Sequence, residues 1–294
     1  MKNFSIIIPH KNLPHLLQRC LDSIPARDDL EIIVVDDDSS EELVDFKSFP
    51  GTDRPDVKVI FDKQSKGAGA ARNIGINKAT GKWLLFADCD DTYTDRLNEF
   101  LSKYEDSEFD VIYFKANLVS EQSSRNTSLN MNIFIDNYLK SGTNIEDIKF
   151  GAWEPWNKMI RRSLVNEYNL VFDEITSSND KMFSLKLGKI VRNIKVSPSV
   201  LYNYILRPGS IIHSKKASKF KNSFNTILRQ NGLYHEVGYK RKEFVPFFLM
   251  RNRSFVNKED IKEYIKYLRK YRTSPLEGLI SNFIPQIIRK LRLR

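Results

Sequence analysis

The feature of this sequence that most constrains its fold is an apolar run that ends abruptly in three carboxylates. The run, residues 83–87, has the length and composition of a buried strand, and Asp88, Asp90 and Asp91 follow at its carboxyl end. Carboxylates at the tip of a buried strand are costly unless a positive group lies beside them. Because side chains alternate along an extended chain, Asp88 and Asp90 are expected on the same side, where hard oxygen ligands suit Mg²⁺ or Mn²⁺.

The same acidic cluster has a second interpretation that requires no ligand. Asp and Thr are favoured just before a helix, where their side chains accept hydrogen bonds from the first backbone amides. Asp91 or Thr94 could cap a helix that is expected over about residues 95–104. The cluster by itself therefore does not decide between a ligand site and a helix cap.

The first 115 residues alternate between strand-like and helix-like segments, which is typical of a parallel sheet covered by helices. Buried strands are expected at residues 4–8, 31–35, 57–61, 83–87 and 110–114. In an open α/β sheet, ligands bind beyond the carboxyl ends of the strands. Polar clusters at 9–12, 36–38 and 88–91 follow three of these strands, so they are expected to converge on one crevice.

The character of the chain changes in two steps after the predicted sheet. Residues 117–150 are rich in Asn and Ser, and a loop-rich insertion with one short helix near 133–139 is expected there. Residues 214–294 are helical in pattern and carry 20 Lys and Arg against 6 Asp and Glu, a net charge of +14 in a chain whose total is +10. This asymmetry suggests a polyanion or an anionic membrane face as partner, or simply a solubilising surface.

The end of the chain repeats apolar residues at intervals of three and four between 276 and 291, and basic residues follow. This pattern predicts a basic amphipathic helix on an anionic membrane, although a helix docked on the protein or a dimer contact has the same pattern. No apolar run of about 18 residues is present, so no membrane-spanning helix is expected. Two cysteines and the lack of a signal-peptide pattern favour the cytoplasm, with peripheral attachment to the inner face of the plasma membrane if the tail binds lipid.

Four motifs resemble, in order and spacing, those of family 2 glycosyltransferases of the GT-A fold. They are Ser-Ile-Ile-Ile-Pro at 5–9, Val-Val-Asp-Asp-Asp-Ser at 34–39, Gly-Ala-Ala-Arg-Asn-Ile-Gly at 69–75 and Phe-Ala-Asp-Cys-Asp-Asp at 86–91, with looser matches at 156–158, 179–180 and 202–210. The resemblance implies an α/β fold with a Rossmann-like, mostly parallel sheet flanked by helices. Residues 1–213 would form the catalytic domain, in which 1–115 bind the nucleotide-sugar and 116–213 the acceptor, and residues 214–294 would form a basic helical C-terminal region.

The same resemblance implies inverting transfer of a sugar from a nucleotide-sugar, by family habit a UDP-sugar, to a hydroxyl of a surface polysaccharide or lipid-linked glycan. Mn²⁺ or Mg²⁺ is the implied cofactor, and nucleic acid is not an expected partner. The implied donor-binding residues are Pro9 and either Asp36 or Asp37 at the base, Arg72 near the nucleotide, Asp88 near the ribose or donor sugar, and Arg207 near the diphosphate.

The resemblance also implies the residues that carry the chemistry. Asp90, together with Asp91, would hold the metal on the diphosphate, and Asp180 would take the proton of the attacking hydroxyl. Trp156 is expected to offer an aromatic face to the acceptor sugar. Two of these residues have competing interpretations, because Asp180 could cap a helix at 181–187 and Trp156 could belong to the core.

Two positions depart from the family pattern, and two other functions remain open. Asn179 stands where a Glu usually precedes the base, and Lys11 stands where a Tyr is common. A sugar-nucleotide nucleotidyltransferase would also use carboxylates and Mg²⁺, but the sequence has no Gly-rich, basic phosphate loop after the first strand. A non-enzymatic protein that binds polyanions through its basic C-terminal region is the second alternative.

Overall fold

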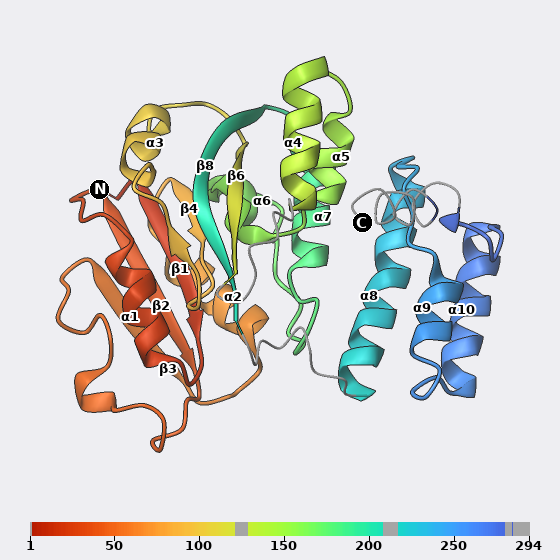
Figure 1. Ribbon diagram of the computed structural model, residues 1–294, viewed down its shortest axis with the longest axis horizontal. Coiled ribbons are helices and arrows are strands. Elements are labelled where there is room, and N and C mark those ends of the chain that lie inside the picture. Colours follow the sequence, from red (N-terminus) through yellow and green to blue (C-terminus); the bar gives the residue numbers. More distant parts are fainter. Residues whose placement is uncertain (1, 121–128, 208–216, 280–283, 285–294) are drawn as a thin grey trace.

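The computed structural model describes residues 2–120, 129–207, 217–279 and 284. These residues form an eight-stranded sheet in the order β3-β2-β1-β4-β7-β6-β8-β5, flanked by helices (Figure 1). The strands are β1 (Phe4–His10), β2 (Leu30–Asp37), β3 (Val57–Asp62), β4 (Trp83–Phe86), β5 (Thr92–Tyr93), β6 (Val111–Ser120), β7 (Lys158–Arg161) and β8 (Ile194–Leu206). The helices are α1 (Pro14–Asp22), α2 (Ala68–Lys78), α3 (Leu97–Tyr104), α4 (Asn130–Ser141), α5 (Ile145–Gly151), α6 (Arg162–Glu167), α7 (Lys181–Ile190), α8 (Ala217–Glu236), α9 (Val245–Arg251) and α10 (Lys258–Tyr271), with 3₁₀ turns at Phe46–Ser48 and Pro155–Asn157.

The N-terminal part of the sheet is parallel, which confirms the predicted α/β fold. β1 pairs in parallel with β2 and β4, and β2 pairs in parallel with β3. β6 and β8 are also parallel, whereas β7 runs antiparallel to β4 and β6, and β5 runs antiparallel to β8. The carboxyl ends of β1, β2 and β4 therefore meet at one edge of the sheet, as the sequence pattern predicted.

The five predicted strands correspond to β1, β2, β3, β4 and β6. The short helix predicted near 133–139 lies within α4, but the continuation of β6 and the second helix, α5, were not predicted. β6 continues to Ser120, and two helices, α4 and α5, follow in place of one short helix in a long loop. Met131 and Ile135 on α4 and Ile148 on α5 are completely buried. A few apolar residues at helical spacing are enough to anchor these helices, although their polar neighbours hide the pattern.

The predicted helix after the acidic cluster is present as α3, but neither suggested residue caps it. α3 begins at Leu97 and follows Arg96, and no side chain makes a capping hydrogen bond there. Thr94 instead donates its hydroxyl to the Val200 carbonyl oxygen at 2.9 Å. The interpretation of the acidic cluster as a helix cap is therefore wrong.

α2 lies tightly against its neighbours because two of its residues have no side chain. A Cβ on Gly75 would lie 2.3 Å from Ile7 Cγ2 on β1, and a Cβ on Gly69 would lie 2.1 Å from the Asp173 carbonyl oxygen. Only glycine permits approaches this close. The first contact holds α2 on the sheet, and the second brings the segment that precedes α7 against the start of α2, next to Arg72.

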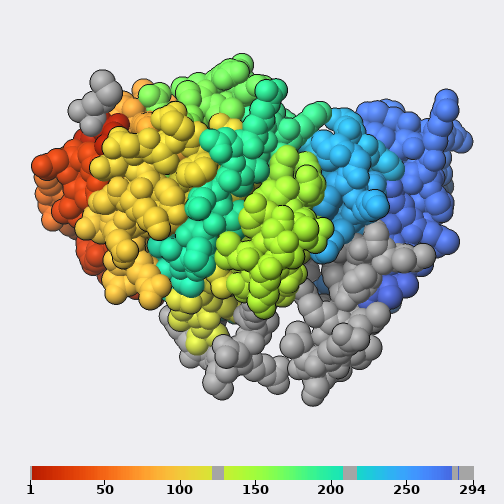
Figure 2. Space-filling view, turned by 90° about the horizontal axis from the view of Figure 1, so that it is seen from above, coloured from red at the N-terminus to blue at the C-terminus, as the bar shows by residue number. Residues whose placement is uncertain are grey.

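α8, α9 and α10 pack together at the end of the molecule opposite β3, and the space-filling view shows them along one side (Figures 1 and 2). Their buried apolar residues are Phe220, Phe224, Ile227, Val245, Leu249, Tyr264 and Tyr267. In the described part of the chain, no helix has the length and apolar character needed to span a bilayer. The predicted domain boundary at 213/214 and most of the amphipathic tail at 276–291 lie outside the described residues and stay predictions.

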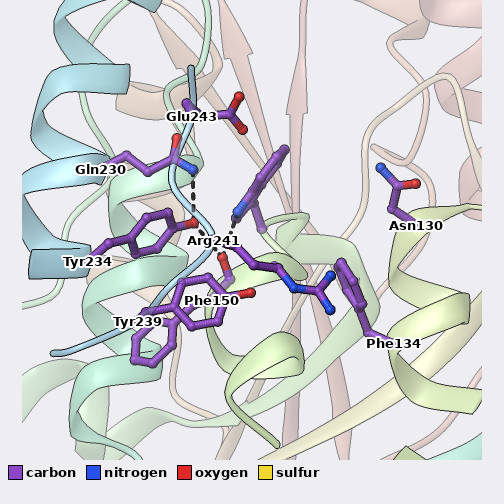
Figure 3. Close-up of a pocket in the computed structure, with 10 residues that line it drawn as sticks. Asn130, Phe134, Phe150, Gln230, Tyr234, Tyr239, Arg241 and Glu243 are labelled. Carbon is purple, nitrogen blue, oxygen red and sulfur yellow. Dashed lines mark hydrogen bonds between the residues drawn. The ribbon is translucent and has the colours of Figure 1, made fainter. Parts of the chain in front are cut away.

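A small cavity of about 60 Å³ marks the junction between α8 and the segment that follows α5 (Figure 3). The Tyr234 hydroxyl on α8 donates to the Phe150 carbonyl oxygen at 2.7 Å, and Trp153 Nε1 donates to the same oxygen at 2.9 Å. Gln230 Nε2 in turn donates to the Tyr234 hydroxyl at 2.8 Å. Because their polar groups bond to one another across the cavity, these residues join the C-terminal helices to the rest of the protein.

Candidate active site

A cavity of about 500 Å³ opens at the carboxyl ends of β1, β2 and β4. Six residues predicted to contact the nucleotide-sugar or metal line it: Pro9, Asp37, Arg72, Asp88, Asp90 and Arg207. Four others, Asp36, Asp91, Trp156 and Asp180, are not among its lining residues. The strand ends therefore converge on one crevice, as expected, but not every polar residue there faces it.

Asp36 is buried behind the cavity and shapes the loop after β1. Its carboxylate accepts hydrogen bonds from the Ser39 amide at 2.9 Å and the Ser39 hydroxyl at 2.5 Å. His10 Nδ1 lies 2.7 Å from Asp36 Oδ2, while His10 Nε2 accepts the Leu13 amide at 3.1 Å, so Nδ1 is the donor to Asp36. Burial raises the pKa of Asp36, but the bonds from His10 and Ser39 outweigh it and lower this pKa overall. Of the two candidates at the base, Asp36 is thus not the one that faces the cavity.

Asp37 does face the cavity, and it lies beside a lysine whose role the sequence left open. Both carboxylate oxygens accept the Gly67 amide, at 3.0 and 3.1 Å. Lys11 Nζ lies 3.6 Å from Asp37 Oδ2 and donates to the Asp37 carbonyl oxygen at 2.8 Å and to Ser65 Oγ at 2.5 Å. Lys11 therefore places a positive charge at this end of the cavity.

Arg72 links the acidic loop after β4 to the segment that precedes α7. Its guanidinium donates to Asp88 Oδ1 at 2.5 Å and to Asn179 Oδ1 at 2.9 Å, and it lies over the Phe172 ring, 5.3 Å from the centroid. Burial raises the pKa of Asp88, and the charges of Asp90 and Asp180 add to this effect, while Arg72 opposes it. Asn179, which departs from the family pattern, thus supplies a neutral acceptor to Arg72.

Asp90 and Asp91 are adjacent in sequence but differ in their surroundings. Asp90 lines the cavity and pairs with Arg207 Nε at 2.9 Å. Asp91 is 1% exposed, and it accepts the Tyr202 hydroxyl at 2.9 Å and the Ile205 amide at 2.7 Å. Burial and the Asp88 charge raise the pKa of Asp91 to about 8. Because protein donors occupy both of its oxygens, Asp91 fastens β8 to the acidic loop, and the prediction that it shares the metal with Asp90 does not fit this geometry.

Asp88 and Asp90 fit a divalent cation whose other ligands come from a phosphorylated substrate. In the described residues, no group of three or more His, Cys, Asp and Glu side chains could hold a metal ion by itself. Asp88 and Asp90 nevertheless line the same cavity, and each lies beside one arginine. Mg²⁺ is commonly bound through one or two carboxylates together with substrate phosphates. The donor set thus fits a cation that arrives with a phosphorylated ligand.

Asp180 occupies the N-cap position of α7, yet its side chain makes no capping hydrogen bond. The charge of Asp180 raises the pKa of Asp88 and of Glu154 and opposes the lowering of the pKa of Lys158, so Asp180 lies near these residues, of which Asp88 lines the cavity. Burial lowers the pKa of Lys158 to about 7, opposed by the charges of Glu154 and Asp180. The competing interpretation of Asp180 as a side-chain cap is therefore not realised, and its carboxylate stays available for another role.

Trp156 does not offer an open face to a sugar. It is 5% exposed, and its ring stacks on the rings of Tyr202 and Tyr204, with centroid distances of 4.7 and 5.6 Å. The core interpretation of Trp156 was the right one. An aromatic residue that does line the cavity is Tyr204, which the sequence did not single out.

The chain belongs to glycosyl transferase family 2, whose model matches residues 5–169. Among curated proteins it is similar to the uncharacterized glycosyltransferase EpsJ of Bacillus subtilis, with 27% identity over 220 residues, or 70% of this chain and 62% of EpsJ. It is also similar to the putative glycosyltransferase EpsH of the same organism, with 24% identity over 252 residues, or 82% of this chain and 71% of EpsH. The chain thus spans less than two thirds of the length of EpsJ.

The fold has a counterpart among solved structures. The crystal structure of S. aureus TarS 1–349 in complex with UDP-GlcNAc superimposes with a TM-score of 0.66 at 21% identity, covering 92% of this chain and 80% of TarS 1–349. A second crystal structure of TarS 1–349, in complex with UDP, gives a TM-score of 0.64. At this level of identity the likeness establishes a shared fold, which is the predicted GT-A arrangement.

Proposed function

We propose that this protein transfers a sugar from a UDP-sugar to an acceptor hydroxyl with inversion at the anomeric carbon. The observation that carries the proposal is the single cavity in which Asp37, Arg72, Asp88, Asp90 and Arg207 meet at the strand ends. Two arginines beside two carboxylates suit a diphosphate that arrives with a divalent cation. Membership of glycosyl transferase family 2 and the UDP-GlcNAc bound by TarS, which shares the fold, support the same assignment.

Each residue then has a defined task. Pro9 and Asp37 form the end of the cavity that receives the base, with Lys11 beside them, and Arg72 holds Asp88 toward the ribose or donor sugar. Arg207 and Asp90 lie where the diphosphate is expected. Mn²⁺ or Mg²⁺, bound through Asp90 with help from Asp88, would supply positive charge to offset the charge that develops on the departing diphosphate. Asp180 takes the proton of the acceptor hydroxyl as the new bond forms.

We expect UDP together with Mn²⁺ to raise the melting temperature of the protein. A ligand that binds only the native state at a hundred times its dissociation constant stabilises it by about 2.7 kcal/mol. The measurement is a thermal unfolding scan with UDP, with Mn²⁺, with both, and with uridine as the control that lacks phosphates. If UDP and Mn²⁺ together leave the melting temperature unchanged, the donor assignment is wrong. The identity of the released product distinguishes sugar transfer from the nucleotidyltransferase alternative, because sugar transfer releases UDP whereas nucleotidyl transfer releases pyrophosphate.

We further propose that the acceptor is a surface-polysaccharide or lipid-linked glycan and that the protein meets it at an anionic membrane on the cytoplasmic side. The support comes from α10, where Ile261 and Ile265 are 41% and 40% exposed. Lys258 and Arg269, also exposed, lie at helical spacing on the same side. An exposed apolar pair flanked by cations suits the interface of an anionic bilayer.

Replacing both Ile261 and Ile265 by Ser should abolish flotation with anionic vesicles, because it removes the apolar part of the α10 face. The measurement compares phosphatidylcholine vesicles with and without phosphatidylserine. Leu139→Ser on α4 is the matched control, since Leu139 is 42% exposed and lies on a different helix. Flotation that is equal for the α10 variant and the native protein would remove α10 as the contact, and failure of the native protein to float would remove the membrane proposal itself.

A further inference from the structure

Tyr202 and Tyr204 point to the same face of β8 but use their hydroxyls differently. Alternate residues of a strand share a face. The Tyr202 hydroxyl donates to Asp91 Oδ2 and accepts the Asp88 amide, both at 2.9 Å, and Tyr202 is completely buried. Tyr204 lines the 500 Å³ cavity, and no residue in the described part of the chain forms a hydrogen bond with its hydroxyl. Tyr202 is thus part of the framework, whereas Tyr204 lines the cavity and its hydroxyl has no hydrogen-bond partner among the described residues.

The ring of Tyr204 is held in place before any ligand binds. Trp156 stacks nearly parallel to it, with an interplanar angle of 13°, and stacks at 9° on Tyr202. Tyr202 is in turn fixed by its two hydrogen bonds to the acidic loop. A rigid aromatic side chain loses little conformational entropy when it binds a ligand. The conformational entropy of Tyr204 is therefore already lost in the folded protein, before a ligand binds.

The surroundings of Tyr204 keep its hydroxyl protonated. Burial, followed by the charges of Asp91, Asp88, Asp90 and Glu154, raises the pKa of Tyr204 to about 12. At neutral pH the side chain thus presents a neutral ring and a hydrogen-bond donor close to Asp88 and Asp90. Thr176 and Asn179, which also line the cavity, add further neutral polar groups.

The neutral side chain of Tyr204 suits a sugar ring better than a phosphate. Aromatic side chains are apolar bodies with a polar tip, so they fit ligands that combine C–H surfaces with hydroxyls. The positively charged residues of the cavity, Lys11, Arg72 and Arg207, are the ones that suit phosphates and carboxylates. We infer that Tyr204 contacts the sugar that is transferred, with its hydroxyl bonded to a sugar oxygen. The inference rests on the proposed function, because it assigns the sugar subsite of the same cavity.

The test compares UDP-sugar binding with UDP binding, by titration calorimetry in Mn²⁺, for the native protein and for Tyr204→Leu and Tyr204→Phe. UDP-GlcNAc and UDP-glucose are the sugar probes. Tyr204→Leu should weaken binding of the preferred UDP-sugar about tenfold, and Tyr204→Phe several-fold, consistent with the loss of one hydrogen bond of about 1 kcal/mol. UDP affinity should stay within about twofold of native, which also shows that the variants are folded.

Tyr168→Leu is the matched control, because Tyr168 is 45% exposed and does not line the cavity. Equal loss of affinity for UDP and UDP-sugar, or no loss for either, would overturn the role of Tyr204 while leaving the proposed function standing. If the native protein binds neither UDP nor the sugar probes, the proposed function fails, and the inference fails with it. A UDP-specific loss would place Tyr204 at the nucleotide and would also overturn the inference.

Discussion

Asp180→Asn should abolish glycosyl transfer while leaving donor binding intact. The amide keeps the shape of the side chain but cannot accept a proton from the acceptor hydroxyl. A positioned general base contributes about 10²- to 10⁴-fold to a rate, and we expect a loss of that size in the turnover number. Because the carboxylate makes no capping hydrogen bond with α7, the substitution should cost little stability. The measurements are UDP release with a lipid-linked glycan acceptor and UDP-sugar affinity by calorimetry.

Glu174→Gln is the control for this variant. It also converts a carboxylate to an amide in the segment before α7, but Glu174 is exposed and, among the described residues, its ion pair is with Lys66 at 3.6 Å. Exposed pairs of this kind contribute little to stability. Native turnover in Asp180→Asn would show that another group takes the proton. A loss of donor affinity equal to the loss of turnover would instead mean that Asp180 binds the donor.

Asp90→Asn should also cause a large loss of turnover, but unlike Asp180→Asn it should weaken the Mn²⁺-dependent binding of UDP as well. Asp90 is the carboxylate that lines the cavity and pairs with Arg207, so its removal takes away a cation ligand and leaves Arg207 without its partner. Loss of one preorganised charge contact at a reacting centre costs roughly 10²- to 10³-fold in rate. We therefore expect both turnover and the Mn²⁺-dependent part of UDP binding to fall. Titrating Mn²⁺ into the protein with saturating UDP measures the second effect.

Asp95→Asn is the matched control, since Asp95 lies five residues further along the chain, just after β5, is exposed, and does not line the cavity. The same experiment separates the enzyme from the polyanion-binding alternative. A protein that acts only through its basic C-terminal helices would be indifferent to the charge at position 90. Unchanged turnover and unchanged Mn²⁺ dependence in Asp90→Asn would remove the metal assignment.

The parallel half of the sheet could be predicted because its signals are local. The runs of β1 and β2 are almost entirely buried, so they are apolar without alternation and end in polar residues. α4 and α5 could not be predicted in the same way. Their few buried residues, such as Met131 and Ile135, sit among polar ones. Only the packing of α4 against β6 and β8, and of α5 against α7, makes them part of the core.

In the candidate site, too, the residues that could be predicted are those whose signals are local in the sequence. Asp37 stands at the carboxyl end of β2, and Asp88 and Asp90 follow β4; both strands pair in parallel with β1, so parallel topology alone brings these residues together. Asp91 and Trp156 were misplaced because their partners on β8 are distant in sequence. The contact of Asp91 with Tyr202 spans 111 positions, and its contact with Ile205 spans 114. The sequence contains no local signal that two adjacent aspartates face opposite environments.

These long-range bonds have a consequence for the newly made polypeptide on the ribosome. Arg72 reaches its partner Asn179 across 107 positions, and the acidic loop is held by β8, which ends at Leu206. Domains generally fold as units during synthesis. A nascent chain that has emerged only as far as β6 contains the strand ends but lacks Asn179 and β8, whose hydrogen bonds orient the side chains at those ends. We therefore expect the polar side chains of the cavity to reach their final arrangement only after translation has passed β8.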